Sequence, residues 1–103
     1  MNKLASRKRA FLKSKAHHLE PIVLIGKNKV SNGTLHSIDK ALNSRELIKV
    51  KFREYKQEKV EIAQFISKNV KAEIVGIVGH IIILFRQNPD PAKQNYHFPL
   101  DLK

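Results

Sequence analysis

Five consecutive apolar residues, Ile81 to Phe85, constrain the fold more than any other part of the sequence. A strand that is apolar at every position must be covered on both faces, because successive side chains point to opposite sides of a sheet. A second β-rich segment, residues 72–78, precedes this strand, and Gly79 marks the turn between them. We therefore expect two consecutive strands in a domain whose helices pack against the sheet.

The rest of the chain alternates between helical and strand patterns. Apolar residues recur at helical spacing in residues 4–19, 31–43 and 56–69, and β-rich runs occupy residues 22–25 and 46–53. The predicted order is α-β-α-β-α-β-β. Short connections between these elements favour right-handed crossovers and a four-stranded mixed sheet of the α/β class.

The length of 103 residues suits one domain with one modest core. We expect a compact core over about residues 3–86 and a turn-rich tail over residues 87–103, with a short extended segment near Tyr96. In the third helix the expected buried stripe is formed by Val60, Ala63, Ile66 and Val70, flanked by Ile62 and Phe65.

The charge of the chain is high and unevenly distributed. Twenty Lys and Arg residues oppose nine Asp and Glu, which gives a formal net charge of +11. Residues 1–53 hold 13 basic and 3 acidic side chains, whereas residues 54–103 hold 7 and 6. Such segregation is typical of a domain that binds a polyanion, and nucleic acid is the expected partner. The alternative is a soluble protein whose many lysines simply face solvent.

A short basic loop after the first strand is the best candidate binding site. The strand ends at Gly26, and Lys27, Asn28 and Lys29 follow before the helix that Ser31 is expected to cap. The N-terminus of a helix presents unpaired N–H groups and a partial positive charge, which both suit a phosphate group. The predicted RNA-binding residues of this loop are Gly26, Lys27, Asn28 and Lys29.

Two further groups of cations extend the candidate surface. In the strand 46–53, Lys49, Lys51 and Arg53 alternate with apolar residues and therefore line one face. Like charges at every second position repel, and a bound anion would relieve that cost, although an ordinary half-exposed strand is the alternative. The first helix contributes Arg7, Arg9 and Lys13, which form either a binding face or an inert solvated one.

The sequence contains no constellation that predicts catalysis. There is no cysteine, no Gly-rich phosphate loop ending in Lys-Ser/Thr, and no Gly-x-Ser-x-Gly or His-Glu-x-x-His motif. The five histidines lie in separate elements without the spacing of metal ligands. We therefore expect no enzyme activity, no cofactor, no metal and no small-molecule substrate. Short apolar runs and the lack of a signal-peptide pattern predict a cytoplasmic protein that does not enter the membrane.

Several segments together resemble the CRM domain (chloroplast RNA splicing and ribosome maturation), in particular its free-standing bacterial YhbY-like members. The resemblance runs from about Lys3 to Arg86, with the segments in the order and spacing of the family. The segments are Ala16-His17-His18-Leu19-Glu20-Pro21 with the following Ile22 to Lys27, Glu46 to Lys51, Val75 to His80, and Leu84-Phe85-Arg86.

The resemblance implies a fold similar to the C-terminal domain of translation initiation factor three and RNA binding without catalysis. It also implies a role with precursors of the large ribosomal subunit, with ribosomal RNA as partner. We expect the protein to act as a monomer. The alternatives are docking on ribosomal proteins and general nucleic-acid binding. In the family the loop carries Gly-x-x-Gly, as in the backbone clamp of KH domains, and here Lys29 replaces the second glycine. We expect Asn28 to supply any left-handed conformation that this turn needs.

Overall fold

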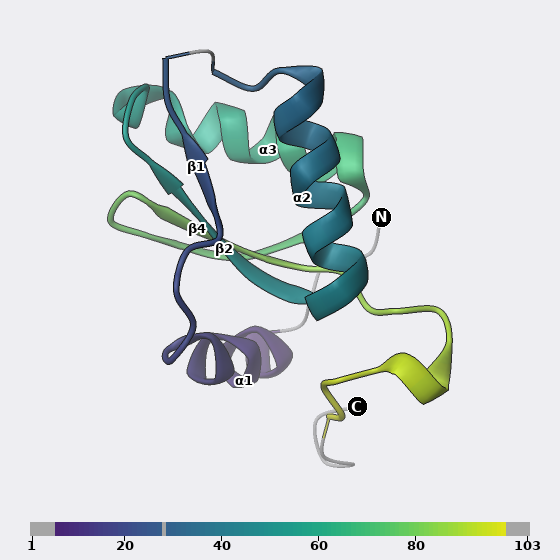
Figure 1. Cartoon of the computed structure of the whole chain (residues 1–103). Helices are drawn as coiled ribbons and strands as arrows, with labels where there is room; N and C mark the ends of the chain where they lie inside the picture. Colours follow the sequence, from purple (N-terminus) through teal and green to yellow (C-terminus); the bar gives the residue numbers. More distant parts are fainter. Residues whose placement is uncertain (1–5, 28, 99–103) are drawn as a thin grey trace.

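The computed structural model describes residues 6–27 and 29–98 (Figure 1). Its elements follow the predicted order, with a 3₁₀ turn before the third helix and another in the tail. They are α1 (Ser6–Ala16), β1 (Val23–Ile25), α2 (Asn32–Arg45), β2 (Leu47–Phe52), η1 (Lys56–Glu58), α3 (Lys59–Val70), β3 (Glu73–Val78), β4 (Ile81–Phe85) and η2 (Pro91–Lys93).

The four strands form one mixed sheet in the order β1-β2-β4-β3. Strand β1 pairs with β2 in parallel, and β4 pairs with both β2 and β3 in the antiparallel sense. Helices α2 and α3 cover one face of this sheet and α1 lies against the other (Figure 1). The predicted α/β class, element order and four-stranded mixed sheet are confirmed.

The central strand β4 is buried on both faces, as its uninterrupted apolar sequence predicts. Ile82 and Leu84 belong to a first core shared with α2 and α3, whereas Ile83 and Phe85 belong to a second core beneath α1. Leu12 and Ala16 of α1 are fully buried in this second core. Each side of the sheet therefore needs its own helical layer, because both faces of β4 must leave water.

The helix boundaries differ from the predicted ones by a few residues. Helix α1 ends at Ala16 and the chain turns there, which carries Leu19 to the second core. Helix α2 continues to Arg45, two residues beyond the predicted end. Ser31 caps α2 as predicted, and its hydroxyl accepts a hydrogen bond from the Thr34 amide at 3.1 Å. Leu4, which belongs to the predicted first helix, lies outside the described residues.

The predicted buried stripe of the third helix is wrong at one position. Val60 is 51% exposed, and the neighbouring Phe65 is 49% exposed. Ile62, Ala63, Ile66 and Val70 form the buried face instead. At about 100° per residue, Val60 lies roughly a quarter turn from the centre of this buried face, so its side chain reaches solvent in the first turn of α3.

The C-terminal tail is attached to the domain by a buried carboxylate. Glu46 is 1% exposed, and its two oxygens accept hydrogen bonds from the backbone amides of Asn88 and Asn95, at 2.6 and 2.5 Å. The tail then places Tyr96 and Phe98 against Phe85 of the second core. The described residues 94–98 form no strand, but they extend the α1 layer of the domain.

No helix within the described part of the chain is both long and apolar enough to cross a bilayer.

Candidate nucleic-acid interface

Three connections meet at one end of the strands of the sheet. Parallel strands β1 and β2 both end there, and the antiparallel β4 begins there after its hairpin turn with β3. The amides of Arg53 and Glu54 donate to the carbonyl of Ile25, and the Phe52 amide donates to the carbonyl of His80. We call this end of the strands, formed by residues 26–27, 29–31, 53–58 and 79–80, the loop end of the sheet.

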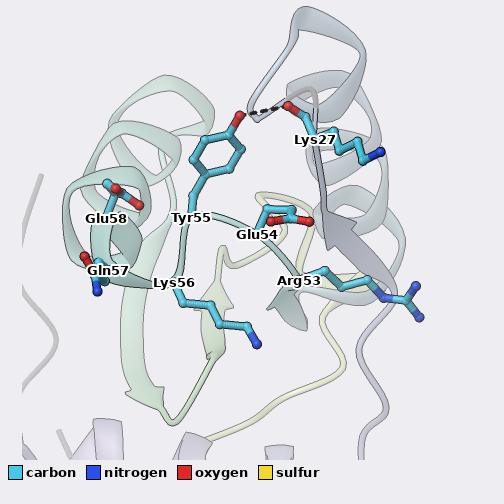
Figure 2. A pocket seen from close by; sticks show the side chains of 7 residues that line it. All are labelled: Lys27, Arg53, Glu54, Tyr55, Lys56, Gln57 and Glu58. Carbon is cyan, nitrogen blue, oxygen red and sulfur yellow. Dashed lines mark hydrogen bonds between the residues drawn. The ribbon is translucent and has the colours of Figure 1, made fainter.

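Tyr55 joins the two larger connections of the loop end. Its hydroxyl donates a 2.8 Å hydrogen bond to the backbone carbonyl of Lys27, as the dashed line in Figure 2 shows. Tyr55 itself has a left-handed backbone conformation, with φ of 57°. That conformation is costly for a bulky residue and persists only where the surroundings hold it in place. Tyr55 is therefore a positioning residue for the basic loop.

Lys29 adopts the conformation that the family's second glycine would adopt easily. Its φ is 56°, and its amide donates to the Gly26 carbonyl at 3.0 Å to close the turn. The Lys29 ammonium lies 5.2 Å from the centre of the Tyr55 ring, a cation–π arrangement. Asn28, which we expected to supply a left-handed conformation, lies outside the described residues, whereas Lys29 has one itself.

The conformation of Lys29 predicts that glycine is better tolerated than alanine at this position. Lys29→Gly and Lys29→Ala both remove the charge and the contact with Tyr55, but only glycine adopts positive φ without steric cost. We expect Lys29→Gly to be more stable than Lys29→Ala by about 1 kcal/mol, measured by urea unfolding. Equal stabilities would show that the loop changes conformation when Lys29 is replaced.

Gly26 has no internal steric reason to be a glycine. A Cβ atom placed on it would meet nothing within 4 Å, and its φ is not in the left-handed region. The open space allows a ligand backbone to approach closely. In the adjacent first turn of α2, the Ser31 cap occupies the Thr34 amide, so the amides of Asn32 and Gly33 are the ones placed to meet a ligand.

Three exposed cations line a shallow hollow at the loop end. Lys27, Arg53 and Lys56 extend from its rim, and Lys27 and Arg53 point to the same side in Figure 2. Glu54 and Glu58 also line the hollow, together with Tyr55 and Gln57. The two acidic groups reduce the local charge without cancelling it, because three cations line the hollow and Lys29 lies against Tyr55 beside it.

The hairpin turn adds a histidine to these cations. The pKa of His80 is lowered from its usual 6.5 by desolvation and then by the charges of Lys56, Lys59 and Lys51. Lys59 also donates a hydrogen bond to the Gly79 carbonyl, so α3 and the turn are joined directly. The lowered pKa favours the neutral form of His80 at pH 7, and the part of the shift that comes from the three lysines shows that cations surround this side chain.

The structure brings only part of the predicted surface together. Lys27, Lys29 and Arg53 lie at the loop end, and Lys51 lies beside it on the α1 side of β2. The Lys49 ammonium donates to the carbonyl of Leu19 at 2.9 Å, so this side chain holds the end of the α1 segment. Its contribution to binding remains a prediction.

The predicted residues of α1 lie in two different places. The side chain of Lys13 crosses β3 at Gly76, where a Cβ atom would come within 2.7 Å of its Cε. Arg7 and Arg9 flank Lys8, whose ammonium lies over the ring of Phe98. Because Phe98 packs on Phe85, the first turn of α1 lies at the opposite end of the strands from the loop end.

The sequence analysis missed four residues of the loop end, namely Tyr55, Lys56, Lys59 and His80. They come from η1, α3 and the hairpin turn, far from the basic loop in the sequence. The polar side of the third helix mixes acidic and basic residues, so its charge pattern carried no signal. Within residues 6–27 and 29–98, no group of three His, Cys, Asp or Glu side chains is arranged to hold a metal ion.

This architecture and its cationic loop end define a small basic α/β domain of the polyanion-binding type. The model of the CRS1 / YhbY (CRM) domain matches residues 4–86. The chain belongs to this family.

Similar proteins support the assignment. A probable RNA-binding protein of Methanocaldococcus jannaschii is 44% identical over 87 residues, which is 82% of this chain and 64% of that protein. An RNA-binding protein of Haemophilus influenzae is 41% identical over 91 residues, which is 87% of this chain and 92% of that protein. The solution structure of a hypothetical Staphylococcus aureus protein, suggested to bind RNA, superposes with a TM-score of 0.78 at 30% identity. That match covers 93% of this chain and 99% of the other.

Proposed function

We propose that this protein binds ribosomal RNA in precursors of the large ribosomal subunit and assists their assembly without catalysis. Its relatives from Haemophilus influenzae and Methanocaldococcus jannaschii are named for RNA binding, which supports RNA as the partner. The resemblance to bacterial YhbY-like members directs the proposal to large-subunit precursors. Action as a cytoplasmic monomer is part of the same proposal.

The observation that carries the proposal is the convergence of cations at the loop end. Lys27, Arg53 and Lys56 reach one hollow from two connections, and Tyr55 fixes the loop that bears Lys27. Flexible ammonium and guanidinium groups around an open glycine are suited to the phosphates of a nucleic-acid backbone. Among the described residues of the loop end, no nucleophile lies beside a general base as in a catalytic centre, which favours binding over chemistry.

Salt dependence and sedimentation together test this function. We expect the purified full chain to bind ribosomal RNA fragments with an affinity that falls steeply with salt, because each phosphate contact releases counterions. We also expect the tagged protein to sediment with large-subunit precursors and to crosslink to their RNA. A shallow salt slope, or sedimentation that persists after the RNA is digested, would contradict direct RNA binding.

Docking on a ribosomal protein is the second candidate function, and one apolar groove favours it. Val30, Ile62 and the half-exposed Phe65 line this groove, and two acidic residues, Glu58 and Glu61, outnumber the one cation, Lys29, in its lining. The acidic lining suits a basic protein segment better than a phosphate backbone. If this groove makes the main contact, Phe65→Ser should abolish association with the particles and leave binding to free RNA unchanged.

A further inference from the structure

One row of side chains crosses the α1 side of the sheet beside the loop end. The strand register aligns Leu24, Lys51, Ile81 and Val78, one residue from each of the four strands. Residues adjacent to them in sequence face the first core, namely Val23, Val50, Ile82 and Ile77. Because side chains alternate along a strand, the aligned row points to the opposite, α1 side. We call this row the open half-face.

Helix α1 covers only the other half of this side. Leu47, Ile83 and Phe85 are buried beneath α1 in the second core, and exposure rises along the strands toward the loop end. Leu24 is 49% exposed and Val78 is 56% exposed. The hairpin of β3 and β4 extends beyond α1 in Figure 1. The open half-face is thus an apolar surface that no described element covers.

The charged groups on and beside the open half-face are basic. Lys51 lies in the row itself, between Leu24 and Ile81. Lys13 crosses the neighbouring position at Gly76. A ligand that complements this surface needs negative charge together with flat apolar groups. Nucleic acid supplies both, through its phosphates and the faces of its bases.

We propose that the open half-face binds unpaired RNA, with bases against Leu24, Ile81 and Val78 and phosphates at Lys51 and the loop end. In a duplex the base faces are stacked on one another, so only a single-stranded segment can place them on aliphatic side chains. This inference rests on the proposed RNA binding and adds the class of RNA and the surface that recognises it. The contact is to base faces and is therefore tolerant of sequence.

The test replaces apolar groups and leaves every charge in place. Leu24 and Val78 lie on the two edge strands, and the double variant Leu24→Thr/Val78→Thr keeps side chains that suit strands. The probe is a fluorescently labelled 12-nucleotide RNA, used either single-stranded or annealed to its complement. Val60→Thr, at a position 51% exposed on α3 across the sheet, is the matched control.

We expect the double variant to lose roughly tenfold in affinity for the single strand while its salt slope stays unchanged, because apolar contact and not charge is removed. Duplex binding should not change, nor should binding of either RNA by the control. If the wild type binds the single strand and the double variant binds it with equal affinity, this inference is overturned and the proposed function stands. Absence of any RNA binding would overturn both. Self-association of the wild type that the double variant abolishes would assign the surface to a second copy instead.

Discussion

Removing the three cations of the hollow should weaken RNA binding roughly a hundredfold near 0.1 M salt. In the variant Lys27→Ala/Arg53→Ala/Lys56→Ala, each lost phosphate contact lowers the slope of log affinity against log salt by about 0.7 for a single strand, and so by about 2 in total. All three side chains are exposed, so the fold should be retained. Titration of labelled RNA at four or more salt concentrations measures both quantities.

A matched variant separates this local effect from net charge. Lys40→Ala/Arg45→Ala/Lys68→Ala removes the same number of exposed cations from the halves of α2 and α3 that point away from the loop end. Screening limits the reach of such charges to about 8–10 Å in physiological salt, so we expect no more than a few-fold loss. Equal losses in the two variants would mean that the bound RNA does not contact the hollow.

Replacing Arg86 with methionine should cost about 2–3 kcal/mol of folding free energy, by comparison with other networks of charged hydrogen bonds. Its guanidinium donates to the Asp39 carboxylate and to the Val70 carbonyl, each at 2.7 Å. It also donates to the backbone carbonyl of Asp39 and to the Asn43 side chain. These bonds join the end of β4 to α2 and to the last turn of α3. Methionine keeps most of the stem packing but satisfies none of the acceptors.

The position of the Asp39 carboxylate limits this loss. Its side chain is 48% exposed, so water can solvate it after the substitution, and the cost stays below that of a fully buried pair. Urea unfolding of Arg86→Met measures the change, with Arg53→Met at an exposed loop position as the control within about 0.5 kcal/mol of wild type. A similar loss in both variants would show that the network adds no stability. RNA affinity of Arg86→Met should match wild type well below its unfolding transition.

Local patterns predict the elements of this protein well. The alternation in β2, the apolar sequence of β4 and the Ser31 cap depend on neighbouring residues, so the sequence alone identifies them. Val60 shows where that reasoning fails. Its spacing to Ala63 is helical, but the buried face is centred on Ile66 and Val70, so Val60 lies at the border of that face and reaches solvent.

The sequence by itself determined the order of elements, the doubly covered central strand and the basic character of the loop after β1. Only the tertiary structure decided which cations share a site. The strand order places β1 beside β2 and β2 beside β4. This brings Lys27, Lys56 and His80 to the loop end, although more than 20 residues separate each from the next in the chain. The same packing directs Lys49 to the Leu19 carbonyl and Glu46 to the tail. Such contacts join residues distant in sequence, and periodicity carries information only about neighbours along the chain.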